Sequence, residues 1–344
     1  MERVEGHLND GQEVQERLAI DTAINTLIVV LVYLVIKMSF DGIRQWRAKV
    51  SILVVGAGPV GLTAALVAVR SGKVLSLTIL DERSRTSLLC RPQQIALDPR
   101  SVKFLLALGV DFDNIEGCWH NDHFFTKIGV FQEHVLSILE QRKQTLDIRI
   151  LLGTKFTEEY IRKMSQGEWP KIIIVADGSC GESSSLLGVN SEFIVESCNA
   201  YGANAALERP DQRQVMRNIF HQSFNAYKTD IEPRMSDLTL PHLQCSRRLF
   251  EIVLSHRRVT SAFIEGDNIV VTLEGEAVRV LNFDTGCGVN LGLRGLESSE
   301  QFIYKIATAV DQSDVFEALA AKIKHSKQVV EEFKLHGLLT SVFE

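Results

Sequence analysis

The sequence lacks the features that mark several protein classes. It has no cluster of basic residues and a formal net charge of −6, which argues against nucleic acid as a partner. Its six cysteines are scattered without a CxxC pair, so we expect reduced thiols inside a cell rather than a disulfide framework. It also has no internal repeat and no low-complexity tract. At 344 residues the chain can bury a large core and hold two domains.

One long apolar stretch lies near the start of the chain. Residues 23–38 are almost all apolar, about 16 positions against the roughly 20 that span a bilayer. No basic segment precedes it and no small-residue cleavage site follows it, so we do not expect a cleavable signal. Acidic residues dominate before the stretch, and the basic residues Lys37, Arg44, Arg47 and Lys49 follow its apolar run.

Two interpretations of this stretch stand. If it is a membrane helix, the positive-inside rule places the rest of the chain in the cytoplasm. If it is a helix or strand buried against the domain, the protein is cytoplasmic. Both interpretations make the protein intracellular.

The most informative stretch runs from Ser51 to Leu66. Residues 52–55 predict a buried parallel strand, three glycines follow with GxGxxG spacing, and a pattern rich in Ala, Leu and Val predicts a helix to about Arg70. In such a turn the glycines allow the bend, the approach of a pyrophosphate and the packing of helix on strand. The helix N-terminus adds N–H groups and a positive dipole end. The sequence therefore predicts a dinucleotide site formed by Gly56, Gly58, Pro59, Val60 and Gly61.

Two later strands also end in acidic residues. The predicted strand Val74–Leu80 is followed by Asp81, which we expect to bind an adenosine ribose, with Glu82 as the alternative. The predicted strand Lys171–Ala176 ends in Asp177-Gly178, which alone is ordinary turn chemistry.

A third motif completes a recognisable set. The strand Val270–Leu273 leads to Gly275-Glu276, and Gly286-Cys-Gly288-Val-Asn290 begins eleven residues after Gly275. Together with the glycine turn and Ala176-Asp177-Gly178, this order resembles the FAD-binding fold of class A flavoprotein monooxygenases, the p-hydroxybenzoate hydroxylase-like group. The segment Asn290–Arg294 is similar to the hydroxylases of ubiquinone biosynthesis. The resemblance covers roughly residues 51–190 and 268–335.

The resemblance implies FAD as the cofactor, with NAD(P)H as a transient reductant. It assigns Gly56, Gly58 and Gly61 to the pyrophosphate and Asp81 to the ribose. Further contacts to the nucleotide and flavin are implied for Arg91, Gln132, Asp177, Glu276 and the backbone N–H groups of Gly286, Gly288, Val289 and Asn290. It names no catalytic side chain, and we expect no metal.

The sequence departs from the family pattern beside the flavin ring. Arg279 replaces the usual His, Glu276 replaces the usual Asp, and Asn282 and Phe283 replace prolines.

The resemblance implies an O2-dependent monooxygenase that hydroxylates an aromatic or apolar small molecule through a flavin C4a-hydroperoxide. Two alternatives stand: a flavin-dependent reductase or dehydrogenase on this fold, and a catalytically degenerate, membrane-tethered flavoprotein that acts through partners.

We expect an α/β fold with a Rossmann-like FAD-binding domain at 51–190, closed by 268–344 with its C-terminal helices. An N-terminal segment, 1–50, precedes it, and a short β-rich substrate-covering segment, 191–267, is inserted. In the inserted segment we expect strands near Phe193–Ser197 and Val259–Ile264 and a helix near Arg247–His256. In the closing part we expect helices near Glu300–Val310 and Val315–Phe333.

Overall fold

The computed structural model describes most of the chain in two separate units. The described residues are 2–91, 93–165, 169–189, 192–198, 225, 236, 252–281 and 288–336. The first unit is Met1–Ala48 and the second is Lys49–Glu344.

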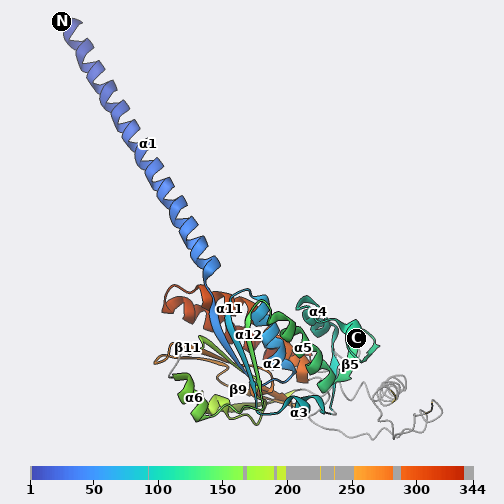
Figure 1. Ribbon diagram of the computed structural model, residues 1–344. Coiled ribbons are helices and arrows are strands. Elements are labelled where there is room, and N and C mark those ends of the chain that lie inside the picture. Colours follow the sequence, from blue (N-terminus) through green and yellow to red (C-terminus); the bar gives the residue numbers. More distant parts are fainter. Residues whose placement is uncertain are drawn as a thin grey trace. The chain divides into compact units, whose positions relative to one another are not determined.

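The first unit is one continuous helix, α1 (Glu2–Arg47) (Figure 1). Its apolar side chains from Ile24 to Trp46 are exposed. The segment Ile24–Arg47 is 24 residues long, and by length and composition it could cross a membrane. Basic residues, Arg44 and Arg47, occupy its last turn.

The second unit is built on a six-stranded sheet in the order β10-β11-β7-β1-β2-β6. Five strands are parallel and β10 is antiparallel to β11. The strands are β1 (Val50–Val55), β2 (Val74–Asp81), β6 (Asp147–Leu152), β7 (Ile172–Val175), β10 (Ser261–Ile264) and β11 (Ile269–Leu273). The central strands β1, β7 and β11 are apolar runs buried on both faces, as parallel sheets require.

Helices cover both faces of this sheet (Figure 1). The core on one face is formed with α2 (Pro59–Arg70), α5 (Ile128–Arg142), α11 (Ser299–Thr308) and α12 (Gln312–His336). The core on the other face includes Phe156 and Val189 and is packed by α6 (Glu158–Ser165) and α7 (Ser183–Leu186). This three-layer arrangement is the expected α/β architecture.

Two three-stranded sheets flank the large one. The first, in the order β3-β5-β4, has β3 (Gln94–Leu97), β4 (Cys118–His120) and β5 (His123–Lys127). The second, in the order β12-β9-β8, has β8 (Phe193–Cys198), β9 (Ile252–Arg257) and β12 (Arg279–Leu281). The remaining described helices are α3 (Arg85–Leu89), α4 (Pro99–Ala107), η1 (Phe112–Asn114), η3 (Gly275–Ala277) and α10 (Gly288–Leu296).

Two expectations for the inserted segment need correction. The helix expected near Arg247–His256 is wrong where the structure describes it, because Ile252–Arg257 is strand β9, paired with β8 on one side and β12 on the other. The strand expected near Val259–Ile264 forms as β10 but belongs to the large sheet. The short turn between β10 and β11 forces antiparallel pairing of these two neighbours.

Candidate functional site: a nucleotide cleft at the strand ends

In the glycine turn after β1, two positions have no room for any side chain. Gly56 has φ +104°, and a Cβ there would lie 2.3 Å from the carbonyl oxygen of Ala176. A Cβ on Gly61 would lie 1.9 Å from the carbonyl oxygen of Gly56. A Cβ on Gly58, in contrast, would meet nothing within 4 Å. The turn is therefore closed toward the protein at Gly56 and Gly61 and open at Gly58, the N-cap of α2.

The carboxylate of Asp81 is held firmly at the end of β2. Its Oδ2 accepts the backbone N–H of Ala57 at 2.7 Å, and the residue is 4% exposed. Arg83 donates its backbone N–H and its Nε to Oδ1 at 2.8 and 3.0 Å. Glu82 is exposed beside it. The acid therefore fixes the glycine turn against β2, while Glu82 offers a second carboxylate at the same place.

Gln132 of α5 supports the glycine turn from inside. Its Nε2 donates to the carbonyl oxygen of Ala57 at 2.7 Å, and the side chain is fully buried. Its Oε1 is buried and has no hydrogen-bond partner among the described residues. A buried acceptor without a donor is a place where a ligand or water is expected.

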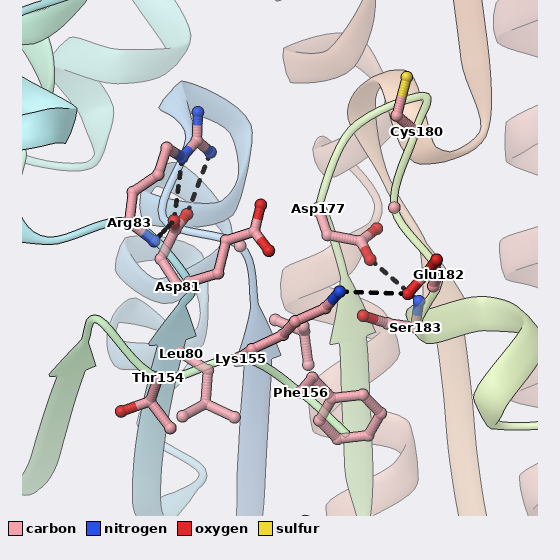
Figure 2. Close-up of a pocket in the computed structure, with 14 residues that line it drawn as sticks. Leu80, Asp81, Arg83, Thr154, Lys155, Phe156, Asp177, Cys180, Glu182 and Ser183 are labelled. Carbon is pink, nitrogen blue, oxygen red and sulfur yellow. Dashed lines mark hydrogen bonds and ion pairs between the residues drawn. The ribbon is translucent and has the colours of Figure 1, made fainter. Parts of the chain in front are cut away.

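Two cavities open at the carboxyl ends of the central strands. Gly56, Asp81, Glu82 and Asp177 line the first cavity, and Arg83 and Asp177 line both. Asp81, the last residue of β2, and Asp177, just after β7, both line the first cavity (Figure 2). The second cavity brings together further predicted residues: Gly58, Pro59, Val60, Arg91, Asp177, Glu276, Gly288 and Val289.

Asp177 is oriented by the loop that follows it. Its Oδ2 accepts the backbone N–H of Ser183 at 3.1 Å. A Cβ on Gly181 would lie 2.0 Å from the Asp177 carboxyl carbon, so a larger residue there would displace the Asp177 side chain. Across the loop Lys155 and Glu182 form an ion pair at 3.2 Å (Figure 2). Sequence reasoning missed Arg83, Lys155 and Ser183, and for Arg83 the signal was its place two residues after Asp81.

Glu276 and the start of α10 close the second cavity. Glu276 lies in η3 and is exposed, with Gly288 next to it. A Cβ on Gly292 would lie 2.5 Å from Cγ2 of Val60, so this glycine lets α10 approach α2. Gly286, also predicted to bind, lies outside the described residues, as do Asn282 and Phe283.

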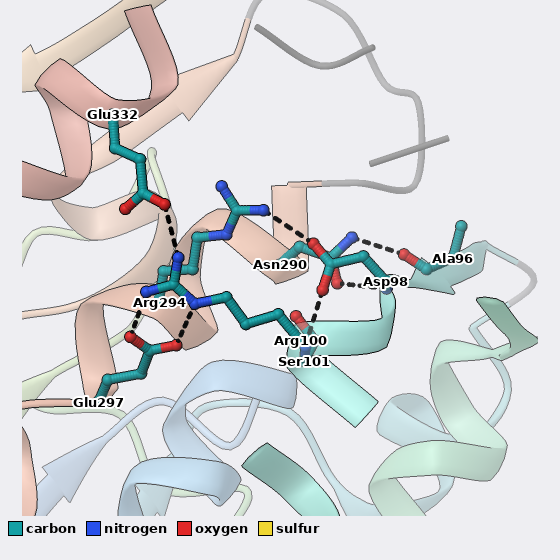
Figure 3. Close-up of polar contacts among 8 residues, drawn as sticks. All are labelled: Ala96, Asp98, Arg100, Ser101, Asn290, Arg294, Glu297 and Glu332. Atoms are coloured by element: carbon teal, nitrogen blue, oxygen red, sulfur yellow. Dashed lines mark hydrogen bonds and ion pairs between the residues drawn. The ribbon is translucent and has the colours of Figure 1, made fainter. Parts of the chain in front are cut away.

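Asn290 lines neither of the two cavities, and its side chain ties α10 to β3 (Figure 3). Its Nδ2 donates to the carbonyl oxygen of Ala96 at 2.7 Å, and its Oδ1 accepts the backbone N–H of Asp98 at 3.2 Å. Arg294 of the same helix pairs with Asp98 at 3.0 Å. A contact of Asn290 to a ligand would therefore have to come from its backbone. The predicted backbone role itself stays a prediction.

These residues fit an extended dinucleotide such as FAD. The turn is open only at Gly58, where a pyrophosphate would approach, and carboxylates line the cleft on both sides. The buried Oε1 of Gln132 has no protein donor among the residues described. Gly58, Asp81 or Glu82, Asp177 and Glu276 would hold the nucleotide and ribityl hydroxyls.

Comparison with known proteins supports the fold. No protein-family model matches the chain, and no curated protein sequence matches it. Among solved structures it is similar to a mutant of PqsL from P. aeruginosa, with a TM-score of 0.50 and 13% identity over 84% of this chain and 95% of that one. The α/β fold class is thus confirmed.

Two further structures have slightly lower TM-scores. Tetracycline destructase Tet(55) has a TM-score of 0.49 and 12% identity over 86% of this chain and 90% of that chain. The p-nitrophenol 4-monooxygenase PnpA from Pseudomonas putida has 0.49 and 14% over the same shares. At 13% identity the similarity to PqsL shows a shared fold and no more.

Proposed function

We propose that the second unit is an FAD-dependent monooxygenase that uses NAD(P)H and O2 to hydroxylate an aromatic or apolar small molecule. The observation that carries this proposal is the cleft itself, in which the glycine turn, Asp81, Asp177 and Glu276 meet along two cavities. Four motifs far apart in the sequence lie at one edge of the sheet, where parallel α/β folds bind their ligands, and this supports the proposal. FAD, when bound, supplies the redox chemistry.

The protein's own residues bind and orient in this proposal. The N-terminus of α2 at Gly58 stabilises the phosphate charge through its N–H groups and dipole. Asp81, held by Ala57 and Arg83, keeps the turn in the binding geometry. Glu276 and the start of α10 form the opposite end of the second cavity, where a helix N-terminus favours negative charge.

The flavin spectrum is the first test. Purified full-length protein, supplied with FAD and then freed of excess, should show flavin absorbance in a one-to-one ratio. Absence of bound flavin would refute both enzyme hypotheses. Given bound FAD, NAD(P)H oxidation that is stimulated by aromatic substrates and consumes O2 supports the monooxygenase. Oxidation by a quinone without O2 uptake would instead support a reductase.

We also propose that α1 anchors the protein in a membrane with the second unit in the cytoplasm. The support is the exposed apolar side chains from Ile24 to Ile43, followed by Arg44 and Arg47 in the last turn of the helix. Full-length protein should stay in the membrane pellet after an alkaline carbonate wash, and a chain without residues 1–48 should not. Release of the full chain would contradict the anchor.

A further inference from the structure

The carboxylate of Asp81 has no acceptor position left for a ligand. Its Oδ2 accepts hydrogen bonds from the backbone N–H of Ala57 at 2.7 Å and from Nη2 of Arg83 at 3.2 Å. Its Oδ1 accepts the backbone N–H and Nε of Arg83 at 2.8 and 3.0 Å (Figure 2). An ionised carboxylate offers about four lone-pair positions, and these donors fill them. The side chain of Asp81 is also only 2% exposed.

A ribose would have to displace donors that Asp81 needs. The two backbone donors cannot leave unless the glycine turn or the end of β2 moves, because they belong to the main chain at Ala57 and Arg83. The other two donors belong to the guanidinium of Arg83, the cation that pairs with the buried carboxylate at 3.0 Å. Hydroxyl groups would replace the hydrogen bonds but not the positive charge, and a buried charge that loses its partner is strongly destabilising.

Glu82 offers an uncommitted carboxylate in the same cavity. It is exposed, and it lines the first cavity of the cleft together with Asp81 and Arg83. No hydrogen bond or ion pair joins its side chain to another of the described residues. It directly follows β2, the strand end at which dinucleotide-binding folds carry the acid that binds a ribose hydroxyl. All acceptor positions of Glu82 are therefore open to a ligand in this cavity.

We infer that Glu82, and not Asp81, is the carboxylate that binds the adenosine ribose, and that Asp81 and Arg83 are positioning residues for the glycine turn. The inference rests on the proposed FAD site and deepens it. It gives the two acids separable effects on binding. A change at Glu82 alters the recognition of the ribose hydroxyl groups alone. A change at Asp81 alters the turn, and with it the binding of every ligand that carries the pyrophosphate.

Paired affinities for FAD and 2′,3′-dideoxy-FAD, the analogue without hydroxyl groups on its adenosine ribose, test the inference. Fluorescence titration uses flavin-free, full-length protein in lipid nanodiscs, and empty nanodiscs give the blank. The wild type should bind FAD about 10-fold more tightly than the analogue, as expected for a hydrogen bond to a charged group. Glu82→Ala should bind FAD about 10-fold more weakly than the wild type and should bind the two ligands equally.

Two further variants separate contact from support. Asp81→Asn should weaken the binding of both ligands by the same factor and lower the urea midpoint, because the Arg83 cation loses its anion. Glu265→Ala, at an exposed glutamate in the turn between β10 and β11, is the matched control and should bind both ligands as the wild type does. Since Glu82 is exposed, Glu82→Ala should fold and decide the question even if Asp81→Asn does not fold.

Three results would overturn the inference and leave the FAD site standing. They are equal affinity of the wild type for the two ligands, a wild-type preference for FAD in Glu82→Ala, and loss of that preference in Asp81→Asn. Each of them requires bound flavin, so each is distinct from failure of the proposed function. Wild-type protein that binds no FAD would refute the proposed function and this inference together.

Discussion

Gly58→Ala separates cofactor binding from folding at a single position. Gly58 has φ −67° and ψ 174°, a conformation open to any residue, and an added Cβ would meet nothing within 4 Å. Alanine is a poorer N-cap than glycine, which lowers the free energy of unfolding by about 0.5–1 kcal/mol. Alanine also reduces the conformational entropy of the unfolded chain, which raises the free energy of unfolding by about 0.4–1 kcal/mol. The free energy of unfolding should therefore change by less than about 0.5 kcal/mol.

The same methyl group should obstruct FAD. It projects into the space where the backbone of a GxGxxG turn approaches the pyrophosphate. Forcing a methyl group into a close-packed contact costs about 1–3 kcal/mol, which corresponds to roughly 5- to 150-fold weaker binding. Titration of FAD fluorescence measures the affinity, and urea denaturation of the FAD-free protein measures the stability.

Gly266→Ala is the matched control for this experiment. Gly266 lies in the turn between β10 and β11, and its Cβ would also meet nothing within 4 Å. This variant should match the wild type in both assays. If Gly58→Ala bound FAD with wild-type affinity, the turn would not hold the pyrophosphate and the reasoning would be refuted.

Three further changes test the packing around the cleft. Gly61→Ala should lower the free energy of unfolding by about 3 kcal/mol, because its methyl carbon would lie 1.9 Å from the carbonyl oxygen of Gly56; urea denaturation that shows wild-type stability would contradict this. Glu274→Gln should cost about 3–5 kcal/mol in the same assay, since it leaves the buried Lys322 without its carboxylate, and Lys322→Met should restore part of the loss. Burial lowers the pKa of His134, whose Nε2 accepts a backbone N–H, so stability should fall as the pH drops below about 6.5 toward the folded-state pKa. His134→Gln should flatten that decline, and an unchanged pH profile would show that another group causes it.

The central sheet was predictable because each of its central strands is a short apolar run in the sequence. The apolar runs at Ile52–Val55 and Ile172–Val175 are buried on both faces, and this requirement is visible in composition alone. Strand β9 was not predictable in the same way. Its segment Ile252–Arg257 mixes apolar and polar residues, and only its two strand neighbours, β8 and β12, decide that it is extended.

The site was predictable where a backbone conformation or a strand end dictates the residue. Gly56 and Gly61 are required by contacts shorter than any side chain allows, so the motif alone located them. Asn290 shows the limit of this reasoning, because its side chain serves the packing of α10 on β3. The hydrogen bonds of Asn290 to Ala96 and Asp98 depend on how α10 and β3 are placed in the fold, and no local sequence pattern predicts them.

The presence of Arg279 has a structural explanation behind the cleft. Arg279 lies beside Glu274, which also pairs with Lys322 of α12 at 2.6 Å, and all three side chains are buried. A Cβ on Gly295 would lie 2.0 Å from Nη2 of Arg279, so α10 leaves room for the guanidinium by carrying glycine there. These charges fix the segment that bears Glu276 against α10 and α12. Arg279 thus belongs to the support of the cleft, and its presence is no argument against a bound flavin.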